Sequence, residues 1–187
     1  MLTNPLVKSL VSTSLAKYLT GGAFLGRNFI DLDSTASAHY LLAKPWQPAA
    51  DYSIEATVYF TGSEIRVTGE SANFNSRISI SVSGGIDWRA GSGGTSLTAP
   101  SSSVPLNVLS IIKVVRLGSS GVIYVNGVSV ASGAVPTDAL NLEVFGRNST
   151  SYASGIISQV GLTDLTTPAN SEYYRLNSLT KEYELPS

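Results

Sequence analysis

The sequence predicts an all-β sandwich of two antiparallel sheets with a short N-terminal helix. Three observations predict it: apolar residues recur with a period of two after residue 28, an Asn-Gly pair separates two β-branched runs, and helical spacing is confined to the first 22 residues. The 187 residues, 43% of them hydrophobic, suit one large core. We expect residues 1–22 to form a helical docking segment and residues 23–187 to form the sandwich domain.

The N-terminal helix is predicted from its ends and its apolar stripe. Asn4 is a good N-cap, Pro5 suits the first helical position, and Gly21-Gly22 supplies the C-terminal stop. The stripe that would bind a partner consists of Leu6, Val7, Leu10, Val11, Leu15 and Tyr18. Packing on the chain's own domain is the alternative interpretation, and membrane binding is disfavoured because two lysines make a weak basic face.

The strands after residue 28 follow the alternation of apolar and polar residues. Ile30 and Leu32 begin it, and residues 52–60 show it most cleanly, with Ser, Glu, Thr and Tyr on the polar face. Further strands are expected within 63–69, 76–82, 85–90, 108–117, 140–144 and 156–162. Residues 91–107 are predicted to be a long surface loop, and residues 168–187 to contain a short helix near Ser171.

A hairpin around Asn126-Gly127 is the strongest local prediction. The flanking segments Val122–Val125 and Val128–Ala131 are rich in β-branched residues, and a type I′ turn needs positive φ at both central positions. The preceding run, 108–117, is almost continuously apolar, which indicates a central strand.

Composition excludes several classes of function. Only 13% of residues are charged, against about 25% in ordinary proteins, and the net charge of −1 does not favour nucleic-acid binding. The absence of cysteine removes disulfides, thiolate metal sites and cysteine catalysis, and mildly favours assembly in a cytosol. No apolar run reaches the ~18 residues of a membrane span, and the N-terminus is not a convincing signal peptide.

Two stretches resemble a known family. IIKVVRLGSSGVIYVNGVSVASG at 111–133 and EVFGRNSTSYASGIISQVGLTDL at 143–165 resemble the laminin-G-like branch of the concanavalin A-like jelly rolls, over roughly residues 40–175. The leader LVKSLVSTSLAKYLTGG, at 6–22, resembles leaders on some virion proteins of tailed bacteriophages. The resemblance implies a jelly-roll sandwich, but one fold hosts many unrelated roles.

Catalytic and metal chemistry are not expected. A retaining glycosidase needs two carboxyl groups about 5–5.5 Å apart, and the Glu-x-Asp-x-x-Glu motif of the glucanase branch is missing. The nearest spacing, Asp31-Leu-Asp33, reads as a solvated strand face, and the single histidine, His39, lacks a nucleophile motif. We therefore predict no enzyme activity, catalytic residue, metal or cofactor. A structural calcium stays open at the loop-edge residues Asp87, Asp138 and Asp164.

Glycan binding would need exposed aromatic rings beside polar partners. The candidate glycan-binding residues are Asp87, Trp88, Arg89, Asn148 and Tyr152. The phase of Trp88 with Ile86 favours the alternative that Trp88 belongs to the core.

These observations and the resemblance predict a non-enzymatic virion protein of a tailed phage, in a capsid-decorating or tail or fibre position. Its expected partners are other virion proteins in a homo-oligomeric or multicopy assembly and a host surface glycan, with neither nucleic acid nor membrane insertion. It would be assembled in the host cytoplasm and reside in the virion. The alternative is a carbohydrate-binding module for a cell-surface glycan, and a glucanase-like hydrolase is disfavoured.

Overall fold

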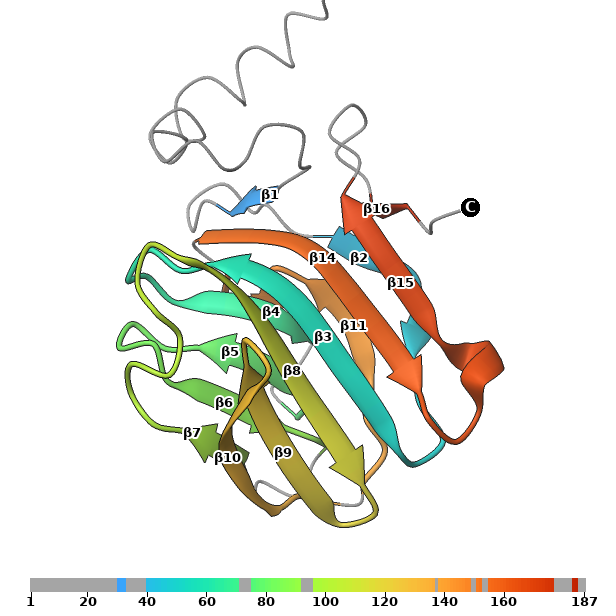
Figure 1. Ribbon diagram of the computed structural model, residues 1–187. Coiled ribbons are helices and arrows are strands. Elements are labelled where there is room, and N and C mark those ends of the chain that lie inside the picture. Colours follow the sequence, from blue (N-terminus) through green and yellow to red (C-terminus); the bar gives the residue numbers. More distant parts are fainter. Residues whose placement is uncertain are drawn as a thin grey trace, which may run out of the picture.

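The strands form two stacked antiparallel sheets in the computed structural model (Figure 1), which describes residues 30–32, 40–70, 75–91, 96–136, 138–148, 151–152, 155–176 and 183–184. The strands are β1 Ile30–Leu32, β2 Tyr40–Trp46, β3 Tyr52–Tyr59, β4 Ile65–Gly69, β5 Arg77–Ile80, β6 Ile86–Arg89, β7 Ser96–Ala99, β8 Leu109–Leu117, β9 Ser120–Val125, β10 Val128–Ala134, β11 Leu142–Phe145, β12 Arg147–Asn148, β13 Ser151–Tyr152, β14 Gly155–Asp164, β15 Glu172–Leu176 and β16 Tyr183–Glu184.

One sheet, which we name sheet A, has the order β10-β9-β8-β3-β14-β15-β16, with β1 also paired to β14. The other, sheet B, has the order β2-β11-β4-β5-β6-β7 and lies behind sheet A in Figure 1. Two short strands, β12 and β13, pair with one another and with neither sheet. The all-β prediction is confirmed, and the predicted N-terminal helix lies outside the described residues. No helix among the described residues is long and apolar enough to cross a membrane.

The core lies between the sheets and follows the period of two. On β3, Tyr52, Ile54 and Val58 point inward and are at most 1% exposed, whereas Glu55 points outward and is exposed. Three aromatic rings pack edge to face at the centre, with Tyr52 6.1 Å from Trp46 and 6.2 Å from Trp88. Such ring pairs add stability beyond the area they bury.

The turn between β9 and β10 has the predicted geometry. Asn126 and Gly127 have φ values of 52° and 80°, as a type I′ turn requires. The Asn126 side chain accepts a hydrogen bond of 2.8 Å from the backbone N–H of Ile111, which ties the turn to β8. The central position predicted for residues 108–117 is also confirmed, because β8 lies between β3 and β9.

The structure corrects two predictions. Residues 91–107 are not all loop, because β7 pairs with β6 and places Leu97 and Ala99 against the core. The helix predicted near Ser171 is wrong. Residues 172–176 form β15, which pairs with β14 and buries Tyr174 beside Phe145, while only a 3₁₀ turn, Pro168–Asn170, precedes it.

Candidate functional site

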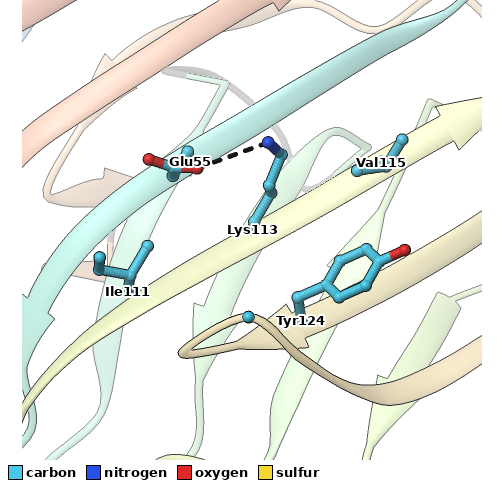
Figure 2. Close-up of a pocket in the computed structure, with 6 residues that line it drawn as sticks. Glu55, Ile111, Lys113, Val115 and Tyr124 are labelled. Atoms are coloured by element: carbon cyan, nitrogen blue, oxygen red, sulfur yellow. Dashed lines mark ion pairs between the residues drawn. The ribbon is translucent and has the colours of Figure 1, made fainter.

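The outer face of sheet A carries an open depression of about 490 Å³. It is lined by Glu55 of β3, by Ile111, Lys113 and Val115 of β8, by Tyr124 of β9 and by Gly127 of the turn. Figure 2 shows the Lys113 side chain reaching toward Glu55, with Ile111 and Val115 on either side along β8. Three neighbouring strands therefore contribute side chains to one surface.

Strand register places the polar centre of this depression in a longer row across the sheet. Reading from β15 to β9, Tyr173 pairs with Gly161, Gly161 with Glu55, Glu55 with Lys113, and Lys113 with Tyr124. We call these five residues the outer row. Directly paired residues point to the same face of a sheet. The outer row therefore presents one tyrosine at each end, with the charged pair Glu55–Lys113 between them.

The charged pair at the centre of the outer row is half exposed. Lys113 Nζ lies 3.5 Å from a carboxylate oxygen of Glu55, and the two side chains are 42% and 50% exposed. An ion pair this exposed contributes only about 0–1 kcal/mol to folding, because water screens it. The ammonium donors and carboxylate acceptors thus remain accessible to a ligand.

An apolar surface adjoins the charged pair. Burial alternates along β8, so the apolar run that predicted a central strand puts Ile112 and Val114 in the core and leaves Ile111 44% exposed on the outer face. Val115 and Tyr124 are half-buried on the same face. The depression therefore combines hydrogen-bonding groups with apolar surface, as small-molecule and sugar sites do.

Tyr173 lies beside a glycine at the other end of the outer row. A Cβ added to Gly161 would be 3.4 Å from Cδ2 of Tyr173, so the ring packs against the bare backbone of β14. The Tyr173 residue is 39% exposed. Because Gly161 carries no side chain, the Tyr173 ring can lie over β14 and extend toward Glu55, with which Gly161 pairs.

The candidates Asp87, Trp88 and Arg89 are split between the two faces of sheet B. Trp88 points inward and is 1% exposed, so the alternative core interpretation holds and its ring cannot stack on a sugar. Its neighbours point outward, where Asp87 accepts a hydrogen bond of 2.8 Å from Arg77 Nε and Arg89 Nε donates to Ser96 at 3.4 Å. The period of two that buries the ring is the reason for this separation.

The other candidate residues are placed only in part. Asn148 and Tyr152 lie on the paired strands β12 and β13, where Asn148 pairs with Ser151 and Tyr152 with Arg147. The six residues of the predicted docking stripe and His39 lie outside the described residues. Their roles stay predictions.

Asp164 is a structural carboxylate. It is fully buried and accepts backbone hydrogen bonds from Ala49, Thr166 and Thr167 at 3.2, 3.0 and 2.7 Å, and a side-chain bond from Asn170 at 3.3 Å. Burial by itself raises the pKa of Asp164, but these hydrogen bonds outweigh burial and hold the pKa below its usual range. The carboxylate therefore fixes the connections at the end of β14, and its oxygens are already occupied.

Within the described ranges, no three Asp, Glu or His side chains gather where they could hold a metal ion. Glu55 is also the one acid among the described residues lining the depression. The surface can thus offer hydrogen bonds and ring contacts, but it shows no paired carboxylates for glycoside hydrolysis.

Sequence reasoning did not identify the outer row. The outward phase of Glu55 follows from the alternation at 52–60, and Lys113 interrupts an apolar run. Joining these residues with Tyr124 and Tyr173 needs the register of five strands, which no local pattern supplies.

No family model matches the chain, and no curated protein matches its sequence. Its structure is similar to a heptameric SAP-like pentraxin from Limulus polyphemus, with a TM-score of 0.56 and 14% identity over 77% of this chain and 80% of that one. Domains LG4-5 of the mouse laminin α1 chain give a TM-score of 0.58 and 14% identity, covering 75% of this chain and 43% of that one.

A third similar structure is the enzymatically active domain of tailspike protein 2 from bacteriophage CBA120, with a TM-score of 0.52 and 16% identity. That match covers 75% of this chain and 25% of the tailspike chain. At such low identity these similarities establish the fold alone. The protein has the concanavalin A-like, laminin-G-like jelly-roll fold that its sequence resembled.

Proposed function

We propose that this protein is a non-enzymatic binding module that binds a glycan on the outer face of sheet A. The outer row carries the proposal, since Tyr124 and Tyr173 stand on either side of the accessible Glu55–Lys113 pair. Tyrosine rings offer apolar faces to pyranose rings, and an ammonium beside a carboxylate supplies donors and acceptors for sugar hydroxyls. The adjoining depression of about 490 Å³ falls within the usual range of ligand sites.

A binding role without turnover is favoured by the single acid of the depression. Glu55 faces Lys113 rather than a second carboxylate, so the pair of acids used by most glycosidases is not assembled there. The similar tailspike structure is an enzymatically active domain, so turnover by this protein needs a direct test.

A virion role is the second candidate, and it is compatible with glycan binding. It is supported by the similarity to a phage tailspike protein and by the resemblance of residues 6–22 to phage virion leaders. In this proposal, residues 1–22 dock the module to other virion proteins as a multicopy component of the capsid or tail. The outer row would then contact a glycan on the host surface.

The experiment is a binding screen of the full chain on an array of linear and branched oligosaccharides that includes bacterial surface glycans. We expect binding to a restricted set and about a tenfold loss of affinity in Tyr124→Ala, the size expected for one lost ring contact. Incubation of each bound glycan with the protein should leave its length unchanged by mass spectrometry.

Val82→Ala serves as the matched control, because Val82 is 69% exposed and lies outside the outer row. It should bind as the parent does. Absence of binding across the array, or equal binding by Tyr124→Ala and the parent, would reject the glycan site. Cleavage of a bound glycan that is lost in Glu55→Gln would reject the non-enzymatic role.

A further inference from the structure

We infer that the outer row recognises one class of glycan, an uncharged and extended oligosaccharide that lies across the strands of sheet A. This inference rests on the proposed glycan-binding function and adds the charge, the length and the direction of the ligand. Each of these follows from a separate feature of the outer row.

The charge of the ligand follows from the charged pair at the centre of the outer row. Along β3, β8, β9 and β14, Glu55 and Lys113 are the charged residues whose phase points outward, and they face one another at 3.5 Å. A site whose two opposite charges neutralise each other attracts neither anions nor cations at long range. Sugar hydroxyls, which both donate and accept, can satisfy the ammonium and the carboxylate together.

The length of the ligand follows from the spacing of the tyrosines. Tyr124 lies on β9 and Tyr173 on β15, four strand spacings apart, which corresponds to about 19 Å at about 4.8 Å per spacing. A single sugar ring is too short to contact both. Simultaneous contact therefore needs a chain of several sugars.

The direction of the ligand follows from the short side chains beside the row. Along β3, the outward neighbours of Glu55 are Ser53 and Thr57, which are only 7% and 9% exposed, so neither rises above the charged pair. The Tyr173 ring lies over Gly161, which pairs with Glu55, so this ring extends from β15 toward the charged pair. The groups that can contact a ligand thus form a row across the strands, from the Tyr173 ring to the charged pair and Tyr124.

The test compares oligosaccharides of one to eight sugars, from neutral and from uronic-acid series, on the same array and by calorimetry for every binder. We expect neutral chains to bind, affinity to rise until the chain spans both tyrosines, and less than a twofold change between 50 mM and 500 mM NaCl. Tyr173→Ala should weaken long chains about tenfold and leave the shortest binding chains unaffected.

Three outcomes separate this inference from the proposed function. Binding of monosaccharides as tight as that of long chains would overturn the length argument while the glycan site stood. A preference for uronic-acid chains with steep salt dependence would overturn the neutrality argument. Absence of any binding would reject the proposed function itself, and the inference with it.

Discussion

Glu70 directly follows β4, and its surroundings disfavour the charged form of its carboxyl group. The residue is only 6% exposed. Burial raises the pKa of Glu70, a hydrogen bond with the Ser76 side chain lowers it in part, and the negative charge of Glu143 raises it further. The folded protein therefore binds the Glu70 proton more tightly than the unfolded chain does, and stability falls as pH rises above the unfolded pKa of about 4.3.

Replacing this carboxylate by a neutral amide should stabilise the protein at neutral pH. We expect Glu70→Gln to raise the melting temperature by a few degrees at pH 7 and to raise it less as the pH falls toward 4, because protonation of the native carboxyl removes the buried charge. Melting curves of both proteins between pH 4 and 8 provide the measurement. Glu64→Gln, which removes a more exposed carboxylate, should show no gain that grows with pH. A pH-independent effect of Glu70→Gln would contradict the assigned cause.

Among the elements, the strands that local patterns predict well are those with one uninterrupted buried face. The alternation at 52–60 predicts β3, and Asn126-Gly127 predicts the hairpin of β9 and β10. Local patterns do not predict β7, because this strand is four residues long and contains mostly small side chains. Although Pro45 disfavours a central strand, β2 forms at the edge of sheet B, where proline is tolerated.

The candidate site was less predictable than the fold. The phases of Glu55, Lys113 and Tyr124 within their own strands can be read locally, but their meeting depends on pairings between distant segments. For Trp88, local sequence is enough to reject a sugar site. The residue lies between the charged residues Asp87 and Arg89, as in a sugar site, but its phase in the strand places the ring in the core. Local sequence thus indicates which face a residue occupies, and only the register indicates its neighbours.

The β9–β10 turn gives a prediction at the level of the element. Gly127 has a φ of 80°, and no atom lies within 4 Å of the position that a Cβ would take, so any cost of a side chain comes from the backbone conformation alone. We expect Gly127→Val to destabilise the domain by about 1–3 kcal/mol. Urea unfolding measures this change. Val128→Ala, at a neighbouring position that is 65% exposed, should unfold at nearly the parent concentration. An unchanged midpoint for Gly127→Val would show that the turn tolerates a branched side chain.

For the whole molecule, the division into residues 1–22 and 23–187 remains a prediction. The described sandwich begins at β1, which pairs with β14, and Leu42 is the first core residue among those that the structure describes. If the stripe from Leu6 to Tyr18 docks onto a partner, then the domain does not need it for folding. The same stripe, exposed in the free protein, would promote self-association.

Deleting residues 1–22 tests this division. The melting temperature should stay almost unchanged, while the self-association of the full chain in analytical ultracentrifugation should disappear. In an assembled virion, the truncated protein should fail to incorporate. Unfolding of the truncated chain would instead assign the helix to the domain's own core, and the support for a virion role would then be reduced to the fold.

The pairing of β3 with β14 at the centre of sheet A has a kinetic consequence. The two strands belong to opposite ends of the chain, and their junction is fixed by contacts such as that of Ala49 with Asp164, 115 positions apart. Bringing such distant segments together costs loop entropy before any pairing compensates it, so folding should take milliseconds to seconds.

During synthesis, the roughly one hundred residues between these strands require on the order of 5–20 s at 5–20 residues per second. Throughout that interval β3 has been synthesised, whereas β14, its partner in sheet A, does not yet exist. The nascent chain should therefore be a chaperone client, and a ribosome stalled before residue 155 should hold a protease-sensitive intermediate without a closed sandwich.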